Sequence, residues 1–325
     1  MANMKTPKLT WRSVEVRAVS VPLRRPVISK VGLFESWPMI LIDLATEEGI
    51  TGRSYLEPYL AQSARYLCPA IRDLAAARIG QPLRPVDDFQ AMHKSLNLVG
   101  YEGMSLIAVS GLDMAAWDAL AQAARLPLAE YLGGSLGRVP AYNSNGLWLT
   151  DVGKLADEAA ALVAEGSFTG LKLRLGRERL ADDLAAIAAV RGAAGEEVKL
   201  MVDFNQGLSF GDALARCHAL DDEELYWLEE PIAYDNLAGF ARLTRELATP
   251  IQLYLHMTHR LQPGTEFGRG LANSLRHCTH LARILGDQRD DPIGFTQLVR
   301  AQNNANVPIE RHQESTPPNR RSRRV

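Results

Sequence analysis

The sequence predicts an α/β protein of two domains, an N-terminal α+β domain followed by a domain of repeated strand–helix units. The chain has 325 residues, more than one domain usually contains. Residues 1–60 are rich in strand-forming residues, and residues 61–132 follow helical spacing. After Arg138, short apolar runs alternate with alanine-rich amphipathic stretches, which is typical of βαβ units.

The composition excludes several classes of protein. Lys plus Arg is 36 and Asp plus Glu is 38, so a net charge of −2 argues against nucleic-acid and membrane-surface partners. The three cysteines form no CxxC motif, which favours a cytoplasmic location and disfavours a zinc cluster. The N-terminal residues lack the apolar core of a signal peptide, and no run of about 18 uncharged apolar residues predicts a membrane span.

The N-terminal domain is predicted to start with strands and to continue with helices. SVEVRAVSVPL and WPMILIDLAT are rich in Val, Ile and Leu, and TEEG after the second run is typical of a hairpin turn. SLIAVSGLDMAAWDALAQAARL places apolar residues at helical spacing, and LGG at 132–134 ends the next short helix.

The second domain admits two architectures, a doubly wound open sheet and a (β/α) barrel. Its predicted strands are VPAYNS, FTGLKLRL, VKLMVDF, LYWLEE and TPIQLYL. No GxGxxG or Walker-type loop follows any of them, which disfavours a nucleotide-binding sheet. In a barrel, polar residues at the carboxyl ends of the strands form the site.

Charged residues end three successive apolar runs. Lys172 and Arg174 are two positions apart, so they lie on the same side of a strand. Asp203 ends the next run, and Glu229 follows 26 residues later (229 − 203), directly before Glu230. Carboxylates at neighbouring strand ends suit a hard cation such as Mg²⁺. Each acid can also be explained as a helix N-cap, and each cation as a solvated surface group.

These residues lie in segments that resemble the mandelate racemase and muconate lactonizing enzyme family of the enolase superfamily, its mandelate racemase group most closely. The segments are SKVGLFESWPMILIDLATEEGITGRSYL, GLDMAAWDALAQAARLPLAEYLGG, GLKLRLG, MVDFNQG and WLEEP, within residues 12–253. The resemblance implies a capping domain over residues 1–137 and a modified (β/α) TIM-type barrel over 138–312, incomplete at its C-terminus. The basic residues 313–325 are expected to form a disordered tail.

The resemblance also implies roles for individual residues. Asp203 and Glu229, with Glu230 beside them, resemble ligands of Mg²⁺, and Lys172 resembles the lysine that contacts the substrate carboxylate. The predicted substrate contacts are Tyr142, Ser144, Asn205, Val27 and Tyr59. The segment LRRPVISKVGLFES, which contains Val27, resembles the lid of the family. Glu57 either faces the pocket, which favours a hydroxylated acid, or faces water.

The function that this implies is abstraction of the proton α to the carboxylate of a 2-hydroxy acid, with Mg²⁺ and a cationic side chain stabilising the anion. Two bases would give racemisation, whereas one base and an acid that expels a β-hydroxyl would give dehydration. The family has a second lysine where this chain has Arg174, and arginine is a poor proton acceptor. His312 stands where the family has its catalytic histidine.

The last third of the chain departs from the family pattern. A third carboxylate is expected at position 255 (229 + 26), but Leu255 stands there. Residues 254–325 hold 5 of the 7 histidines and no lysine, and family-like fragments alternate with foreign sequence. We hypothesise reading-frame shifts or recent decay, which resequencing of codons 253–325 would test. The alternative function is therefore a non-catalytic relative with an incomplete metal site. An open barrel would also expose apolar strands, which predicts a homo-oligomer.

Overall fold

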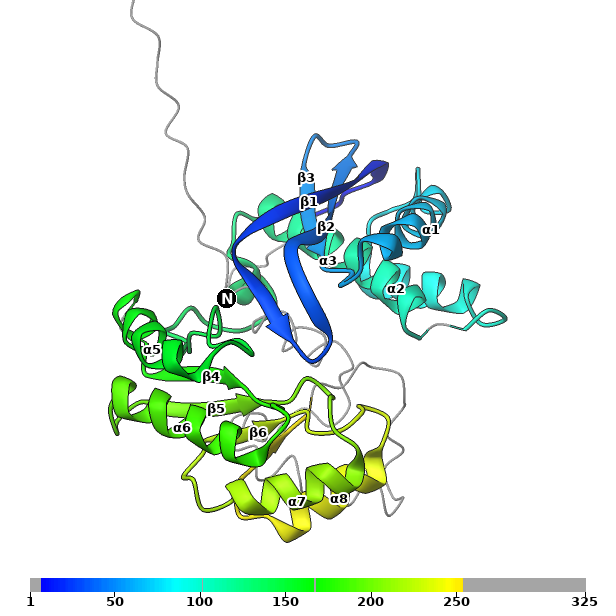
Figure 1. The fold of residues 1–325 in the computed structure, drawn as a ribbon. Helices are drawn as coiled ribbons and strands as arrows, with labels where there is room; N and C mark the ends of the chain where they lie inside the picture. The colour runs from blue at the N-terminus through cyan, green and yellow to red at the C-terminus, as the bar shows by residue number, and fades with distance from the viewer. Residues whose placement is uncertain (1–6, 101, 167, 254–325) are drawn as a thin grey trace, which may run out of the picture.

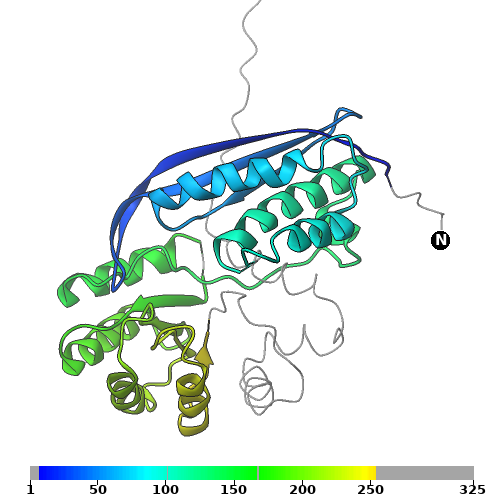
Figure 2. The same cartoon turned by 90° about the vertical axis from the view of Figure 1, so that its right-hand side faces the viewer.

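The computed structural model describes residues 7–100, 102–166 and 168–253, which form two domains that contact each other (Figure 1). The first has an antiparallel sheet with helices on one face (Figure 2). Its elements are β1 (Trp11–Ser29), β2 (Gly32–Thr46), β3 (Thr51–Leu56), the 3₁₀ turn η1 (Ala61–Ser63), α1 (Ala64–Ala76), α2 (Pro85–Ser95), α3 (Met104–Ala124) and α4 (Leu128–Tyr131). The predicted order of strands and then helices is confirmed.

The sheet forms because β2 alternates between buried and partly exposed residues. Ile40, Ile42 and Leu44 are fully buried, so one face of the strand packs on the helices. The N–H of Thr46 donates to the carbonyl of Ile50 across 2.9 Å, which closes the turn predicted from TEEG. The strands therefore form a continuous hairpin sheet, in which β2 pairs with both β1 and β3.

Helix α3 lies directly on the sheet, and glycines make this close approach possible. A Cβ on Gly52 would lie 1.9 Å from the carbonyl oxygen of Ala115, and one on Gly111 would lie 2.5 Å from the side chain of Ile42. Among the described residues, α3 is the one helix long and apolar enough to cross a membrane by length and composition. More than half of it is buried inside the domain, as in the core helix of a globular domain.

The second domain is built on a parallel sheet with the strand order β4-β5-β6-β7. A helix follows each of the strands β4, β5 and β6. Its elements are the 3₁₀ turn η2 (Val152–Lys154), α5 (Leu155–Ala164), β4 (Gly170–Arg174), α6 (Leu180–Ala194), β5 (Lys199–Asp203), α7 (Phe210–Leu220), β6 (Trp227–Glu229), α8 (Leu237–Glu246) and β7 (Ile251–Gln252). The α/β class, with a capping domain and a parallel α/β domain, is confirmed. The strand units expected after residue 253 lie outside the described residues.

One predicted strand is shorter than expected. The run VPAYNS was predicted to form a strand, but only Asn143 pairs, in a parallel bridge with Leu171. The Asn143 N–H donates to Gly170 and its carbonyl accepts from Lys172, while residues 139–141 are exposed. The exposed residues form no strand pairing, so the segment joins the sheet at Asn143 alone. The domain boundary at residues 137 and 138 stays a prediction.

Candidate active site

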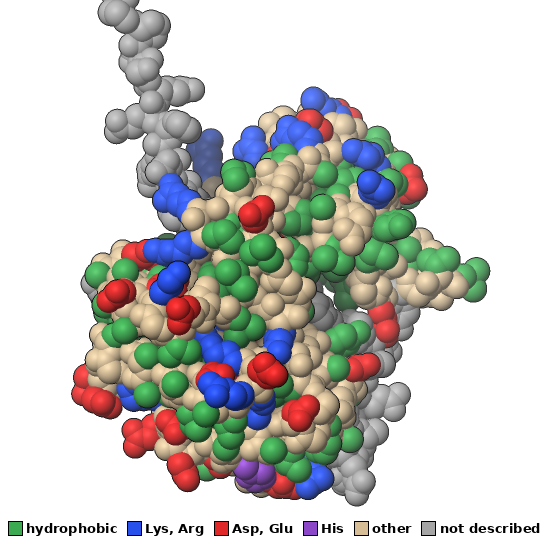
Figure 3. Space-filling view, viewed as in Figure 1, with side chains coloured by type: hydrophobic (Ala, Val, Ile, Leu, Met, Phe, Trp, Pro, Cys, Tyr) green, Lys and Arg blue, Asp and Glu red, His purple; other side chains and the backbone are tan. Residues whose placement is uncertain are grey.

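The register of the parallel sheet brings three of the predicted site residues to one level. Arg174, the last residue of β4, is paired with Asp203, the last residue of β5, and Asp203 is paired with Glu229, the last residue of β6. Lys172 precedes Arg174 by two positions and faces the same side. We call Lys172, Arg174, Asp203 and Glu229 the strand-end cluster. Figure 3 shows charged side chains of both signs close together where the two domains meet.

Lys172 links the two carboxylates of the cluster. Its Nζ lies 2.8 Å from Oε1 of Glu229 and 3.2 Å from Oδ2 of Asp203, and the side chain is buried. Burial on its own would lower the pKa of Lys172, but the charges of Glu229 and Asp203 raise it above its ordinary value. The ring of Tyr142 lies 5.9 Å from Nζ. In this arrangement Lys172 is a fixed cation rather than a free base.

Arg174 is held by carbonyl groups and by an aromatic ring. Its Nη1 donates to the carbonyls of Ser144 (3.1 Å) and Lys172 (3.3 Å), and its guanidinium lies 4.2 Å from the centre of the Trp148 ring. Nε lies 3.8 Å from Oδ2 of Asp203 and has no hydrogen-bond partner in the described part of the chain. Burial lowers the pKa of Arg174, yet an arginine remains a cation at physiological pH.

The two carboxylates of the cluster are oriented by their neighbours in sequence. Asn205 donates to Asp203 twice, from its backbone N–H (2.7 Å) and from its side-chain amide (3.0 Å). The indole N–H of Trp227 donates to Oε2 of Glu229 across 3.0 Å. These hydrogen bonds orient the acids so that Oδ2 of Asp203 and Oε1 of Glu229 contact Lys172. The predicted role of Asn205 as a substrate contact is not tested, but its amide orients Asp203.

Glu230 follows Glu229 directly and is a buried acid. It is 8% exposed, and its Oε1 has no hydrogen-bond partner among the described residues. The pKa of Glu230 is raised to about 7, chiefly because burial disfavours the charged form, and the charges of Asp203 and Glu229 add to the rise. A hydrogen bond from Gln206 opposes this rise.

The loops at these strand ends carry backbone strain. Asn205, Gln206 and Glu230 have φ values of 46°, 61° and 41°, in the left-handed region that residues other than glycine seldom adopt. Hydrogen bonds hold them there, since Gln206 N–H donates to the Glu230 carbonyl (2.7 Å) and Glu230 N–H donates to the Gln252 carbonyl (3.0 Å). Strain of this kind gathers at functional sites, where the surrounding structure imposes it.

The tip of the β1–β2 hairpin (residues 27–34) lies over the strand ends. The N–H of Leu149 donates to the Ile28 carbonyl across 2.9 Å. The Lys30 side chain lies against two glycines, since a Cβ on Gly207 would lie 2.5 Å from Lys30 Cγ and one on Gly176 would lie 2.9 Å from Lys30 Cε. Arg25, before the tip, forms an ion pair with Glu165 of the second domain. Lys30 lies in the predicted lid segment, but no individual role was predicted for Lys30 or Trp148. The two glycines lie in the family-like segments GLKLRLG and MVDFNQG.

The remaining predicted residues are placed in two regions. Val27 is half-buried and pairs with Phe34 in the hairpin tip, next to the docked Ile28. Tyr59 is 43% exposed and packs edge-on against Trp37, with 6.1 Å between ring centres. Trp37 also forms a hydrogen bond with Glu57, whose pKa is raised because burial disfavours its charge. His312 and position 255 lie outside the described residues.

The strand-end acids suit a magnesium ion in kind, although the described residues contain no group of three or more His, Cys, Asp and Glu arranged to hold a metal. Mg²⁺ is commonly bound through one or two carboxylates, with the remaining positions taken by water and substrate. Asp203 and Glu229 offer two such carboxylates to a single cation, since both lie within 3.2 Å of Lys172 Nζ. The pair therefore fits Mg²⁺, while the role of Glu230 as a ligand stays a prediction.

Comparison with known proteins places this site in a family. Residues 11–133 match the mandelate racemase / muconate lactonizing enzyme N-terminal domain, and residues 154–263 match the enolase C-terminal domain-like model. The crystal structure of an enolase from alpha proteobacterium bal199 with bound magnesium is 46% identical, with a TM-score of 0.76 over 83% of this chain and 73% of that one. This chain belongs to the mandelate racemase / muconate lactonizing enzyme family of the enolase superfamily.

Other members of the family differ in their reactions. A Bradyrhizobium enolase complexed with magnesium and mandelic acid is 35% identical, with a TM-score of 0.74 over 84% of this chain and 73% of that one. Arabinonate dehydratase of Saccharolobus solfataricus is 32% identical over 71% of this chain, and L-talarate/galactarate dehydratase of Salmonella typhimurium is 36% identical over 47%. The chain spans 62% and 38% of the length of these two dehydratases.

Proposed function

We propose that this family member removes the proton α to the carboxylate of a 2-hydroxy acid, and that it acts as an acid-sugar dehydratase rather than a two-base racemase. The observation that carries the proposal is that Lys172 Nζ lies 2.8 Å from Glu229 and 3.2 Å from Asp203, two acids at adjacent strand ends. Relatives named as dehydratases, and a relative complexed with magnesium and mandelic acid, support the substrate class.

The residues of this chain would divide the work as follows. Asp203 and Glu229 would hold Mg²⁺, which supplies positive charge to the substrate carboxylate when bound. Lys172, a fixed cation, would bind a carboxylate oxygen of the substrate and so stabilise the charge that forms when the α-proton leaves. Asn205 keeps Asp203 in place, and the Tyr142 ring lies 5.9 Å from the Lys172 ammonium.

Arg174 is the reason for preferring dehydration to racemisation. A racemase of this type needs a base on each face of the substrate, and a guanidinium held by two carbonyls and the Trp148 ring cannot accept a proton. One base on the opposite face is sufficient for dehydration when an acid assists departure of the β-hydroxyl. His312 remains the predicted base.

A second candidate function is carboxylate binding without catalysis. Two features support it: Lys172 already forms ion pairs with both acids, and the described residues hold no cluster of three metal-binding side chains. The third ligand expected at position 255 is a leucine. A homo-oligomer and a cytoplasmic location are further proposals, which rest on the sequence alone.

Calorimetric titration with Mg²⁺ and deuterium exchange separate these functions. We expect stoichiometric Mg²⁺ binding that Asp203→Asn abolishes and that Asp157→Asn, an exposed acid on α5, leaves unchanged. With Mg²⁺ bound, a panel of 2-hydroxy and sugar acids in deuterium oxide should then reveal one that exchanges its α-hydrogen. Loss of the β-hydroxyl without inversion supports dehydration. Metal binding without exchange across the panel would establish the non-catalytic function.

A further inference from the structure

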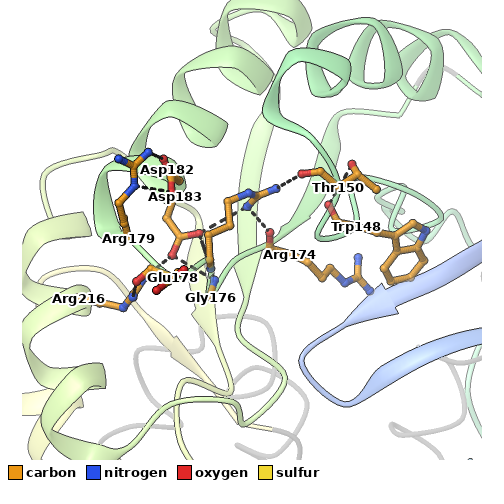
Figure 4. Close-up of polar contacts among 10 residues, drawn as sticks. Trp148, Thr150, Arg174, Gly176, Glu178, Arg179, Asp182, Asp183 and Arg216 are labelled. Atoms are coloured by element: carbon orange, nitrogen blue, oxygen red, sulfur yellow. Dashed lines mark hydrogen bonds and ion pairs between the residues drawn. The ribbon is translucent and has the colours of Figure 1, made fainter.

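Asp183 on α6 is a fully buried acid whose two oxygens are both occupied. Oδ1 accepts from the backbone N–H of Arg177 (3.0 Å), and Oδ2 accepts from Nη1 of Arg216 (2.8 Å) on α7. The N–H of Gly176 points between the two oxygens, 3.2 and 3.1 Å away. One carboxylate thus holds the turn after β4 to both neighbouring helices (Figure 4).

Arg177 extends this contact toward the strand-end cluster. Its Nη1 lies 3.4 Å from Asp183 and also donates to the carbonyl of Arg174 (3.1 Å), while its Nη2 donates to the carbonyl of Thr150 (3.3 Å). Thr150 ends the segment 148–150, in which Trp148 stacks on Arg174 and Leu149 binds the hairpin tip. Figure 4 shows these groups in a row from Arg216 to Trp148.

The same turn also contacts the hairpin tip directly, through Gly176 and Lys30. Gly176 has φ of 107° and lies against the Lys30 side chain, where a Cβ would come within 2.9 Å of Lys30 Cε. Displacement of the turn would therefore disturb two contacts of the tip. One is the packing of Lys30 on Gly176. The other is the Leu149 hydrogen bond to Ile28, which Arg177 supports through its bond to Thr150.

We propose that Asp183 is a positioning residue, which acts through Arg177 to fix the turn after β4 and the segment 148–150, and so docks the hairpin tip over the strand ends. The inference rests on the proposed function only in taking the strand ends as the reaction site. A buried acid that merely stabilised the fold would hold its own turn and would not control a hydrogen bond between the two domains.

Amide hydrogen exchange at Leu149 tests this role, because its N–H bonds directly to the hairpin tip. The full chain is compared as wild type, Asp183→Asn and Arg177→Met. Arg216→Met is the matched control, which removes a cation from Asp183 and a hydrogen bond to the Glu178 carbonyl but leaves the bonds of Asp183 to Gly176 and Arg177. We expect Asp183→Asn and Arg177→Met to speed exchange at Leu149 at least tenfold, while exchange at Ile42 in β2 changes less than twofold.

The control separates docking from general stability. Arg216→Met should leave Leu149 exchange within about twofold of wild type, because it affects α7 and not the segment 148–150. If Asp183→Asn does not fold, Arg177→Met decides alone. Faster exchange only at Gly176 and Arg177, with Leu149 unchanged, would overturn the proposal. The proposed function fails separately, if no 2-hydroxy acid exchanges its α-hydrogen with the wild type.

Discussion

Both domains bury carboxylates beside an arginine, but positive and negative charges balance in only one of the two sites. In the capping domain, Asp88 accepts from the Trp11 indole (2.9 Å) and the Arg84 N–H (2.9 Å) and forms an ion pair with Arg78. Both of its oxygens are occupied. Nε of Arg78 has no hydrogen-bond partner among the described residues, but no negative charge is left over.

The strand ends of the second domain have a surplus of acid. Lys172 and Arg174 form ion pairs with Asp203 and Glu229, and the charges of Lys172 and both acids also act on Glu230. Buried atoms of Arg174 and Glu230 lack hydrogen-bond partners in the described residues. Buried polar groups are normally paired, and unpaired ones need an explanation. The balanced Asp88 site therefore supports the fold, whereas the surplus of acid at the strand ends suits a further cation or ligand.

The largest effect should come from breaking the Asp88 site. Asp88→Ala leaves the Arg78 charge and the Trp11 N–H buried without their acceptor, which should lower the free energy of unfolding by roughly 3–5 kcal/mol. Asp87→Ala is the control, since Asp87 is 65% exposed and its ion pair with Arg84 spans 3.8 Å, and it should cost less than about 1 kcal/mol. Urea unfolding measures both. Equal costs would contradict a structural role for Asp88.

Mg²⁺ should be able to replace the positive charge of Lys172 in the strand-end cluster. Lys172→Met leaves Asp203 and Glu229 facing each other without compensation, and we expect a loss of about 2–3 kcal/mol in metal-free buffer. Mg²⁺ at about 100 times its Kd should restore about 2.7 kcal/mol by binding the folded state. Lys199→Met, at the exposed start of β5, should show neither effect. Destabilisation that Mg²⁺ does not relieve would mean that the two acids do not share a cation.

The sequence could predict the strand-end cluster because parallel strands repeat with the chain. The 26-residue interval between Asp203 and Glu229 corresponds to one strand–helix unit, and the observed register places these residues side by side. The two-residue spacing of Lys172 and Arg174 likewise fixes their common side. Periodic structure turns sequence spacing into spatial order, so these predictions needed no knowledge of the loops.

The rest of the site depends on contacts that periodicity does not encode. Trp148 reaches Arg174 from a segment without regular structure, and Lys30 reaches Gly176 and Gly207 from another domain. The left-handed backbone of Glu230, with a φ of 41°, is likewise not predicted by strand periodicity. Such features follow from loop conformation and domain docking, which are set by tertiary structure rather than by local pattern.

A smaller loss of stability should show that the geometry of the Arg174 guanidinium matters in addition to its charge. Arg174→Lys keeps the charge but loses the fork that reaches the Ser144 and Lys172 carbonyls and the stacking on Trp148, so we expect a cost of about 1–2 kcal/mol. Arg245→Lys, at an exposed position of α8, should cost almost nothing. Urea unfolding followed by tryptophan fluorescence measures both. An unchanged free energy of unfolding would show that the guanidinium geometry is not needed.

The smallest effect concerns two acids of the capping domain with opposite shifts. Burial raises the pKa of Glu57, so the folded state binds its proton more tightly, and stability falls as pH rises above the ordinary value of 4.5. Hydrogen bonding from Thr10 lowers the pKa of Glu48, so its contribution is present at neutral pH and is lost as pH falls through the lowered value. At pH 8, Glu57→Gln should therefore raise the melting temperature by a few degrees, roughly as expected for a change below 1 kcal/mol, while Glu48→Gln should lower it. At pH 4 both differences should shrink. The same sign for both variants at pH 8 would mean that the Glu57 carboxylate is solvated in the folded state.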